Sequence, residues 1–283
     1  MSPHYVCPVL EAAWWGFVGG AALLVGAVLG LYLKVGLRVI GLVMAFGAGV
    51  LISAVAFELT QEAYRTGGST AAALGLAAGA LTFFAGDWLI DRRGGHRRKS
   101  PVHGGVRLPE PAADTGSRSS GGSRGSAAGG TPGGAASGAA ASSAGALVLG
   151  ALLDGIPESA AIGISLLGGG GVGVAMVAAV FLSNIPESMS ATTGLKASGR
   201  STGWILRLWS LVVAVSAVSA VLGYALLGGA SEETVAFIQT FAAGAVLTML
   251  ADTMLPEAVE HAGRLVGLLT VVGFAVAFFL SAA

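Results

Sequence analysis

Charge is scarce in this chain, and cysteine is almost absent. Only 11% of the 283 residues are Asp, Glu, Lys or Arg, against about 25% in soluble domains, and 54% are hydrophobic. The single cysteine, Cys7, excludes an internal disulfide and a cysteine-rich metal site. The first ten residues contain no Lys or Arg, so they lack the basic start of a cleavable signal peptide. These absences exclude a soluble domain and predict an integral membrane protein.

Several apolar segments are long enough to cross a bilayer as helices, which takes roughly 20 residues each. We predict an all-α protein with eight transmembrane helices, at residues 12–33, 39–59, 70–90, 144–167, 172–195, 204–227, 234–255 and 265–281. The chain then divides into four parts: helices one to three in 1–91, a loop in 92–143, a central helix pair in 144–195, and helices six to eight in 196–283.

The positive charges give this arrangement a direction. Arg65 is the one basic residue expected on its face of the membrane, whereas the other fourteen of the 15 Lys and Arg residues fall on the opposite face. Because cytoplasmic loops carry the excess of Lys and Arg, both termini are expected outside, in a multi-pass protein of the plasma (inner) membrane. All five tryptophans lie near predicted span ends, as expected of an interfacial belt: Trp14, Trp15, Trp88, Trp204 and Trp209.

The loop 92–143 is rich in Gly, Ser and Ala and opens with a basic cluster. Such a composition cannot bury a core, so we predict a disordered cytoplasmic loop. His96 and His103 within it are more simply solvated linker residues than a metal-collecting site.

An internal repeat relates the second and seventh predicted spans. At an offset of 195 residues, Phe46, Gly49, Glu62 and Ala63 match Phe241, Gly244, Glu257 and Ala258. The two spans run in opposite directions, so the repeat is inverted, with three helices on either side of a central pair. A 3+2+3 inverted repeat is an architecture of secondary transporters.

Two related hexapeptides, Asp154–Ser159 and Ser183–Ser188, stand in the middle of the central pair. Asp154 and Glu158 are four residues apart and share a helix face, as do Ser183 and Glu187, while Asn184 is three residues from Glu187. Pro157 and Pro186 each remove a backbone donor, which frees the carbonyl oxygen four residues earlier.

Carboxylates at this depth need compensation. Each costs about 2.5–3.5 kcal/mol near the bilayer centre, and neither span contains a Lys or Arg to neutralise it. A bound cation, protons or a hydrated cavity could compensate. Carboxylate, amide and carbonyl oxygens together form a hard ligand set, so we predict a cation site from Asp154, Glu158, Ser183, Asn184 and Glu187. Two kinked helices with protonated, hydrogen-bonded glutamates are the alternative.

The layout and the two motifs resemble the ZIP family of divalent metal transporters. Asp154 falls on the family's metal-ligand histidine, Glu158 and Glu187 on its two central glutamates, and Asn184 on a polar ligand position. The resemblance implies zinc or a similar divalent ion carried into the cytoplasm. This chain departs from the pattern because its motifs contain no histidine and Gly155 replaces a ligand-bearing position. The departures suggest one site and a shift from zinc toward Mn²⁺ or Fe²⁺.

Other polar residues lie near the span ends. Glu58 and Glu62 are candidates for an entrance, and Asp252, Glu257 and His261 for an exit or a proton relay; for the latter, an ordinary interfacial helix end is an equally good explanation. Met44, Met189, Met249 and Met254 are expected to serve packing, because no cluster of them emerges from the sequence.

The leading prediction is therefore a divalent cation transporter that is not an enzyme, has no cofactor and shows no nucleotide-binding loop. A non-transporting sensor or scaffold remains an alternative, and so does an intramembrane hydrolase using Asp154 with Asp252. The expected partners are divalent metal ions and the lipid bilayer. A homodimer is left open, and no nucleic acid is expected.

Overall fold

The structure is a computed structural model that describes residues 8–33, 35–92, 133–168 and 172–281, with the side chains of 91 and 133–148 left out. Every regular element in these residues is helical. In chain order they are α1 (Pro8–Tyr32), α2 (Leu37–Ala54), the π-helix η1 (Val55–Thr60), α3 (Gln61–Arg92), α4 (Gly133–Ser165), the 3₁₀ turn η3 (Leu166–Gly168), α5 (Val174–Ala197), α6 (Thr202–Leu227), α7 (Glu232–Met249), the π-helix η4 (Leu250–Met254), α8 (Leu255–Ala262) and α9 (Leu265–Ser281).

Helix occupies the predicted spans with modest shifts at their ends. The largest shift is at α4, which begins at Gly133 instead of 144 and so takes in the end of the predicted loop. The rest of that loop, including His96 and His103, lies outside the described residues. Five stretches of the described chain are long and apolar enough to cross a membrane: Pro8–Tyr32, Leu37–Ile90, Val174–Ala197, Thr202–Leu227 and Glu232–Ala262. The chain is thus an all-helical, multi-pass membrane protein.

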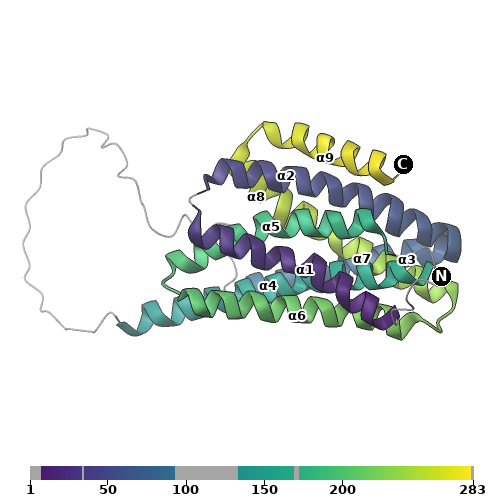
Figure 1. Cartoon of the computed structure of the whole chain (residues 1–283), viewed down its shortest axis with the longest axis horizontal. Helices are drawn as coiled ribbons and strands as arrows, with labels where there is room; N and C mark the ends of the chain where they lie inside the picture. The colour runs from purple at the N-terminus through teal and green to yellow at the C-terminus, as the bar shows by residue number, and fades with distance from the viewer. Residues whose placement is uncertain (1–7, 34, 93–132, 169–171, 282–283) are drawn as a thin grey trace, which may run out of the picture.

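The helices form one elongated bundle, in which α1 begins and α9 ends at the same end (Figure 1). The predicted topology places this end outside, and we call it the outer end; the opposite end is the inner end. The helix continues from α2 through η1 into the start of α3, and α3 itself turns back at Gly68, whose φ of 80° is left-handed. A glycine is required at such a turn because other residues rarely adopt this conformation.

Packing divides the helices into two groups. In one group α3 packs on α7, and α2 packs on α9 and α8; in the other, α1 packs on α5 and α6, and α4 packs on α6. The groups meet where α2 touches α5 and where α4 touches α7. Small residues permit close approach of the backbones: a Cβ on Gly49 would collide with Thr270 of α9, and one on Gly244 with Leu76 of α3.

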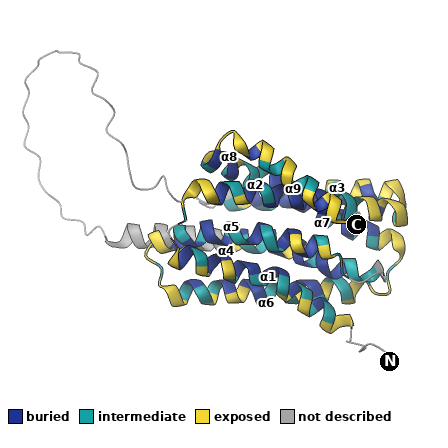
Figure 2. Ribbon diagram, turned by 45° about the horizontal axis from the view of Figure 1, so that its top comes forward, coloured by how far each residue is buried: buried dark blue, intermediate teal, exposed yellow. Residues whose placement is uncertain are grey.

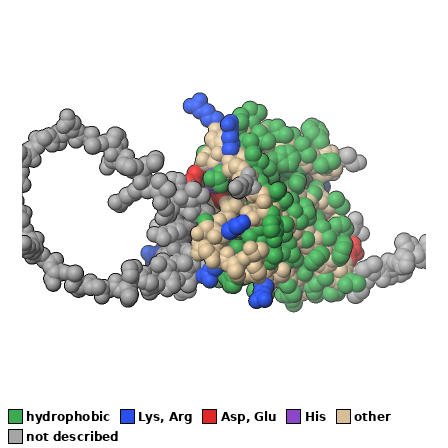
Figure 3. Space-filling model, turned by 60° about the vertical axis from the view of Figure 1, so that its left-hand side comes forward, with side chains coloured by type: hydrophobic (Ala, Val, Ile, Leu, Met, Phe, Trp, Pro, Cys, Tyr) green, Lys and Arg blue, Asp and Glu red, His purple; other side chains and the backbone are tan. Residues whose placement is uncertain are grey.

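Hydrophobic side chains cover much of the face seen in Figure 3, and Figure 2 shows that exposed residues lie along the outside of the helices. On α9, Leu268, Val271 and Phe279 are each more than 60% exposed, which suits contact with lipid chains. Trp14 and Trp88 are also exposed, in keeping with an interfacial belt. Trp209 departs from that expectation: it is only 2% exposed, and its indole N–H donates to the hydroxyl of Thr192 (2.8 Å).

Candidate cation site

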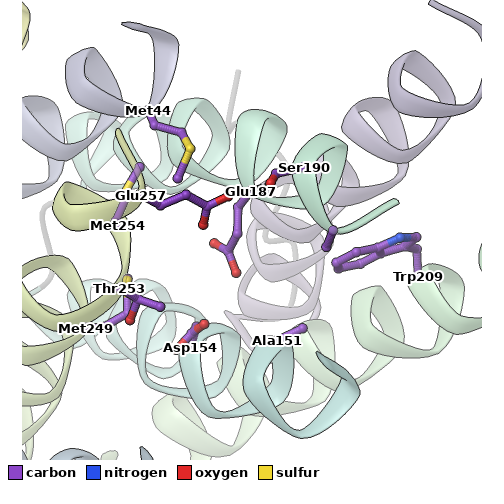
Figure 4. Close-up of a pocket in the computed structure, with 11 residues that line it drawn as sticks. Met44, Ala151, Asp154, Glu187, Ser190, Trp209, Met249, Thr253, Met254 and Glu257 are labelled. Atoms are coloured by element: carbon purple, nitrogen blue, oxygen red, sulfur yellow. Dashed lines mark hydrogen bonds between the residues drawn. The ribbon is translucent and has the colours of Figure 1, made fainter. Parts of the chain in front are cut away.

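The two hexapeptides lie on α4 and α5, and both helices continue through their prolines, Pro157 and Pro186. A small, partly open cavity lies beside them (Figure 4). Asp154 of α4 and Glu187 of α5 both line it, so the structure brings together these two predicted ligands from separate helices. The remaining lining residues come from five other elements and from the same two helices: Met44, Ala151, Ser190, Ala191, Trp209, Met249, Thr253, Met254 and Glu257.

Glu158 is the most deeply buried carboxylate near this cavity, with 1% of its surface exposed. Neither of its oxygens has a hydrogen-bond partner. Asp154, one helical turn away and 6% exposed, repels Glu158 when both are ionised. A buried charge without a partner is strongly disfavoured, so the carboxyl group of Glu158 requires a proton or a cation beside it.

Ser183 and Asn184 are also buried, but they take part in contacts between helices. The Nδ2 of Asn184 donates to the backbone oxygen of Gly19 on α1 (3.2 Å). The hydroxyl of Ser183 donates to the backbone oxygen of Val180 (3.0 Å), and the backbone of Ser183 faces Gly47 of α2. Neither side chain is among the residues that line the cavity.

The residues proposed for an exit have three different environments. Glu257, on the first turn of α8, lines the cavity and accepts a hydrogen bond from the hydroxyl of Ser190 on α5. His261, one turn further, packs against Gly41 of α2, and its Nδ1 is buried without a hydrogen-bond partner. Asp252, within η4, is half-buried and is not among the lining residues.

The two residues proposed for an entrance also differ from each other. Glu58, within η1, is half-buried, and its Oε2 accepts the backbone N–H of Met176 on α5 (3.1 Å). Glu62, on the first turn of α3, is exposed. Of these two residues, Glu58 is the one for which the structure identifies a hydrogen bond to the other helix group.

Three methionines that no sequence pattern groups together line the cavity. Met44 comes from α2, Met249 from α7 and Met254 from η4, and all three line it together with the carboxylates (Figure 4). These methionines were expected to serve packing, and they are indeed buried, yet they also give the cavity a soft, polarizable side. Their positions along the chain share no motif, so only the three-dimensional arrangement reveals the cluster.

The residues that line the cavity are spread around it and do not converge on a single point. Among the residues whose placement is described, no three His, Cys, Asp or Glu side chains are grouped closely enough to hold a metal ion. Asp154, Glu187 and Glu257 face the same cavity from α4, α5 and α8. No protein-family model matches this chain, and no curated protein matches it either.

Proposed function

We propose that this protein carries divalent metal cations (Zn²⁺, Mn²⁺ or Fe²⁺) across the plasma (inner) membrane into the cytoplasm, as a member of the ZIP-like transporters that its motifs resemble. In this proposal the chain crosses the membrane eight times, with both termini outside. Asp154, Glu158 and Glu187 supply most of the cation ligands, and Asn184 and Ser183 complete the set after rearrangement.

Glu158 is the observation that carries the proposal. A carboxyl group that is 1% exposed and has no hydrogen-bond partner destabilises the fold. Its presence therefore points to a role other than stability. Repulsion from the Asp154 carboxylate raises the cost of ionising Glu158, and neither predicted span contains a Lys or Arg that could neutralise this charge. A cation bound at these oxygens supplies the positive charge that neutralises the carboxylates. The oxygens in turn replace part of the cation's hydration water.

The chemistry of the proposed ligands indicates which cations suit the site. Carboxylate and amide oxygens favour hard ions such as Mn²⁺, and they also bind Fe²⁺ and Zn²⁺. Gly155 bears on the number of sites: a Cβ added there would meet nothing closer than the Ser216 hydroxyl at 3.7 Å, so packing alone does not demand a glycine. The missing side chain at this position supports a single site.

Three features support the inverted repeat. The π-helices begin at Val55 and Leu250, which are separated by the same 195 residues as the sequence matches. The glycines Gly49 and Gly244 share that offset, and each lies against the backbone of a packed helix. The pairing of helices also suits a two-fold relation, because α2 on α9 corresponds to α7 on α3, and α1 on α5 corresponds to α6 on α4. π-helices often mark functional positions in helices.

The cavity suggests how a cation would move. Its additional residues on α4 and α5, Ala151 and Ser190, lie one turn from Asp154 and Glu187 on the side toward the inner end, and Glu257 lines it too. Toward the outer end, Glu158 is sealed by packing. The geometry supports release toward the cytoplasm, with Glu257 as the next carboxylate on the way.

A metal sensor that does not transport is the second candidate. The observation that favours it is the altered ligand set, because neither motif contains the histidine of the family pattern that it resembles. A sensor would bind the cation but would not release it on the other side. Binding and uptake measured on the same protein distinguish the two functions.

The test is uptake of Zn²⁺, Mn²⁺, Fe²⁺, Cd²⁺ and Co²⁺ into proteoliposomes, with equilibrium binding measured in parallel. Glu158→Gln and Glu187→Gln should abolish uptake, because each removes one charge with little change in shape. Glu232→Gln, an exposed glutamate at the start of α7, is the matched control and should leave uptake intact. Uptake no greater than in empty vesicles would refute transport, and binding without uptake would indicate a sensor. Uptake that survives both site variants would refute the site.

A further inference from the structure

The N-terminus of α5 lacks the side chain that normally caps a helix. The first backbone N–H groups of a helix have no partner within the helix, and the side chain at the N-cap position usually accepts one of them, two or three residues on. Here the N-cap residue is Gly173, which has no side chain to offer. Its own N–H donates to the hydroxyl of Ser165 at the end of α4 (3.1 Å).

Glu58 supplies the missing cap from another helix. Its Oε2 accepts the N–H of Met176, which stands three residues after Gly173, the position that an N-cap side chain would serve. The negative carboxylate also suits the partial positive charge at a helix N-terminus. Glu58 belongs to η1, the π-helix in the group of helices that does not contain α5.

Gly173 provides the space for this contact. A Cβ placed on Gly173 would lie 2.5 Å from Oε2 of Glu58, so even an alanine would push the carboxylate away. The glycine and the glutamate therefore fit each other, although they are far apart in the sequence. Since α5 carries Asn184 and Glu187, the contact sets where these two residues stand relative to α2.

We propose that Glu58 is a positioning residue that caps α5 from the neighbouring helix group and so holds the outer end closed, instead of acting as a cation ligand at an entrance. The effect of Glu58 on transport rests on the proposed function. The hydrogen bond between Glu58 and Met176 does not, because it can be measured in the absence of any metal.

Hydrogen exchange tests the cap directly. In the full chain in lipid nanodiscs, without metal, Glu58→Ala should speed exchange in the first turn of α5 by about tenfold, because the Met176 amide loses its acceptor. Glu58→Gln should stay close to the wild type, since an amide oxygen still accepts the bond. Gly173→Ala should resemble Glu58→Ala, and in the double variant the two effects should not add, because the added methyl group then has no carboxylate to displace. Unchanged exchange in Glu58→Ala overturns the cap.

Uptake kinetics test the role. A positioning residue changes the maximal rate and leaves the KM for the metal nearly constant, so Glu58→Ala should lower the maximal rate at least about fivefold and Glu58→Gln should restore most of it. If both variants instead raise the KM at least about fivefold, Glu58 is a ligand and the proposal is wrong. Gly203→Ala, where an added Cβ meets no atom within 4 Å, is the control for a new methyl group. Altered exchange in a protein that transports nothing would support the cap and refute the transport function alone.

Discussion

Replacing Glu158 by methionine should make the protein more stable and inactive at once. Methionine has nearly the length of glutamate, so the packing around position 158 is preserved while the carboxyl group disappears. Both oxygens of Glu158 are buried without partners, and an unsatisfied buried polar group costs about 1–3 kcal/mol. We expect the free energy of unfolding to rise by about this amount in metal-free buffer.

Added metal should reverse the order of stability. A ligand that binds only the folded state stabilises it by about 2.7 kcal/mol at a concentration one hundred times its dissociation constant. The wild type should gain this stability with Mn²⁺ or Zn²⁺, and Glu158→Met should gain none. The free energies can be measured by SDS titration in mixed micelles, with chelator and with metal, alongside uptake in proteoliposomes.

The control is Ile162→Met, a volume-conserving change at a fully buried position one turn further along α4, which should cost less than about 1.5 kcal/mol. If Glu158→Met destabilises the metal-free protein by more than this control does, then the carboxyl group makes a favourable interaction in the apo state. That result would refute the proposal that Glu158 is retained to bind a cation.

Two further substitutions, each with a comparison variant, test the helix packing at Gly244 and the hydrogen bond between Ser190 and Glu257. Gly244→Ala should destabilise the protein by about 1–3 kcal/mol, because its methyl group meets the backbone of α3, whereas Gly203→Ala should have almost no effect in the same SDS titration. Ser190→Ala should cost about 0.6 kcal/mol, and at most about 1.7 kcal/mol, through the loss of its hydrogen bond to Glu257, since these are the mean and the maximum for hydrogen bonds between membrane helices. Glu257→Gln should keep that stability, since its amide oxygen still accepts; a loss as large as that of Ser190→Ala would show that the charge, not the hydrogen bond, matters.

The helices were predictable because long apolar runs leave the backbone no alternative in lipid. The start of α4 was not, since residues 133–143 are Gly, Ala and Ser without apolar bulk, and the helix there extends beyond the part of the chain that the bilayer requires. The π-helices η1 and η4 also escaped prediction. Pro256, which has no N–H to donate, stands two residues after η4, but no proline lies near η1, so the sequence contains no signal common to both.

The site was predictable only in part, for a geometric reason. Spacing of three or four residues predicts which side chains share a face of their own helix, but it does not say which neighbouring helix or cavity each of them meets. Glu187 faces the cavity, while Asn184, on the same helix, reaches the backbone of α1. The three methionines reach the cavity from segments that are distant in sequence, and no local pattern could have joined them.

The proposed repeat places different chemistry at equivalent positions, and this difference gives the cavity its direction. Glu62 and Glu257 are separated by the repeat offset, yet Glu62 is exposed while Glu257 lines the cavity and binds Ser190. Glu58 caps α5, whereas its counterpart Thr253 lines the cavity with a buried hydroxyl that has no partner. Glu58 thus contacts α5 at its N-terminus, and Glu257 contacts it further along, at Ser190 beside the cavity. Because the cavity lies at the Glu257 contact, this asymmetry suits the proposed release toward the inner end.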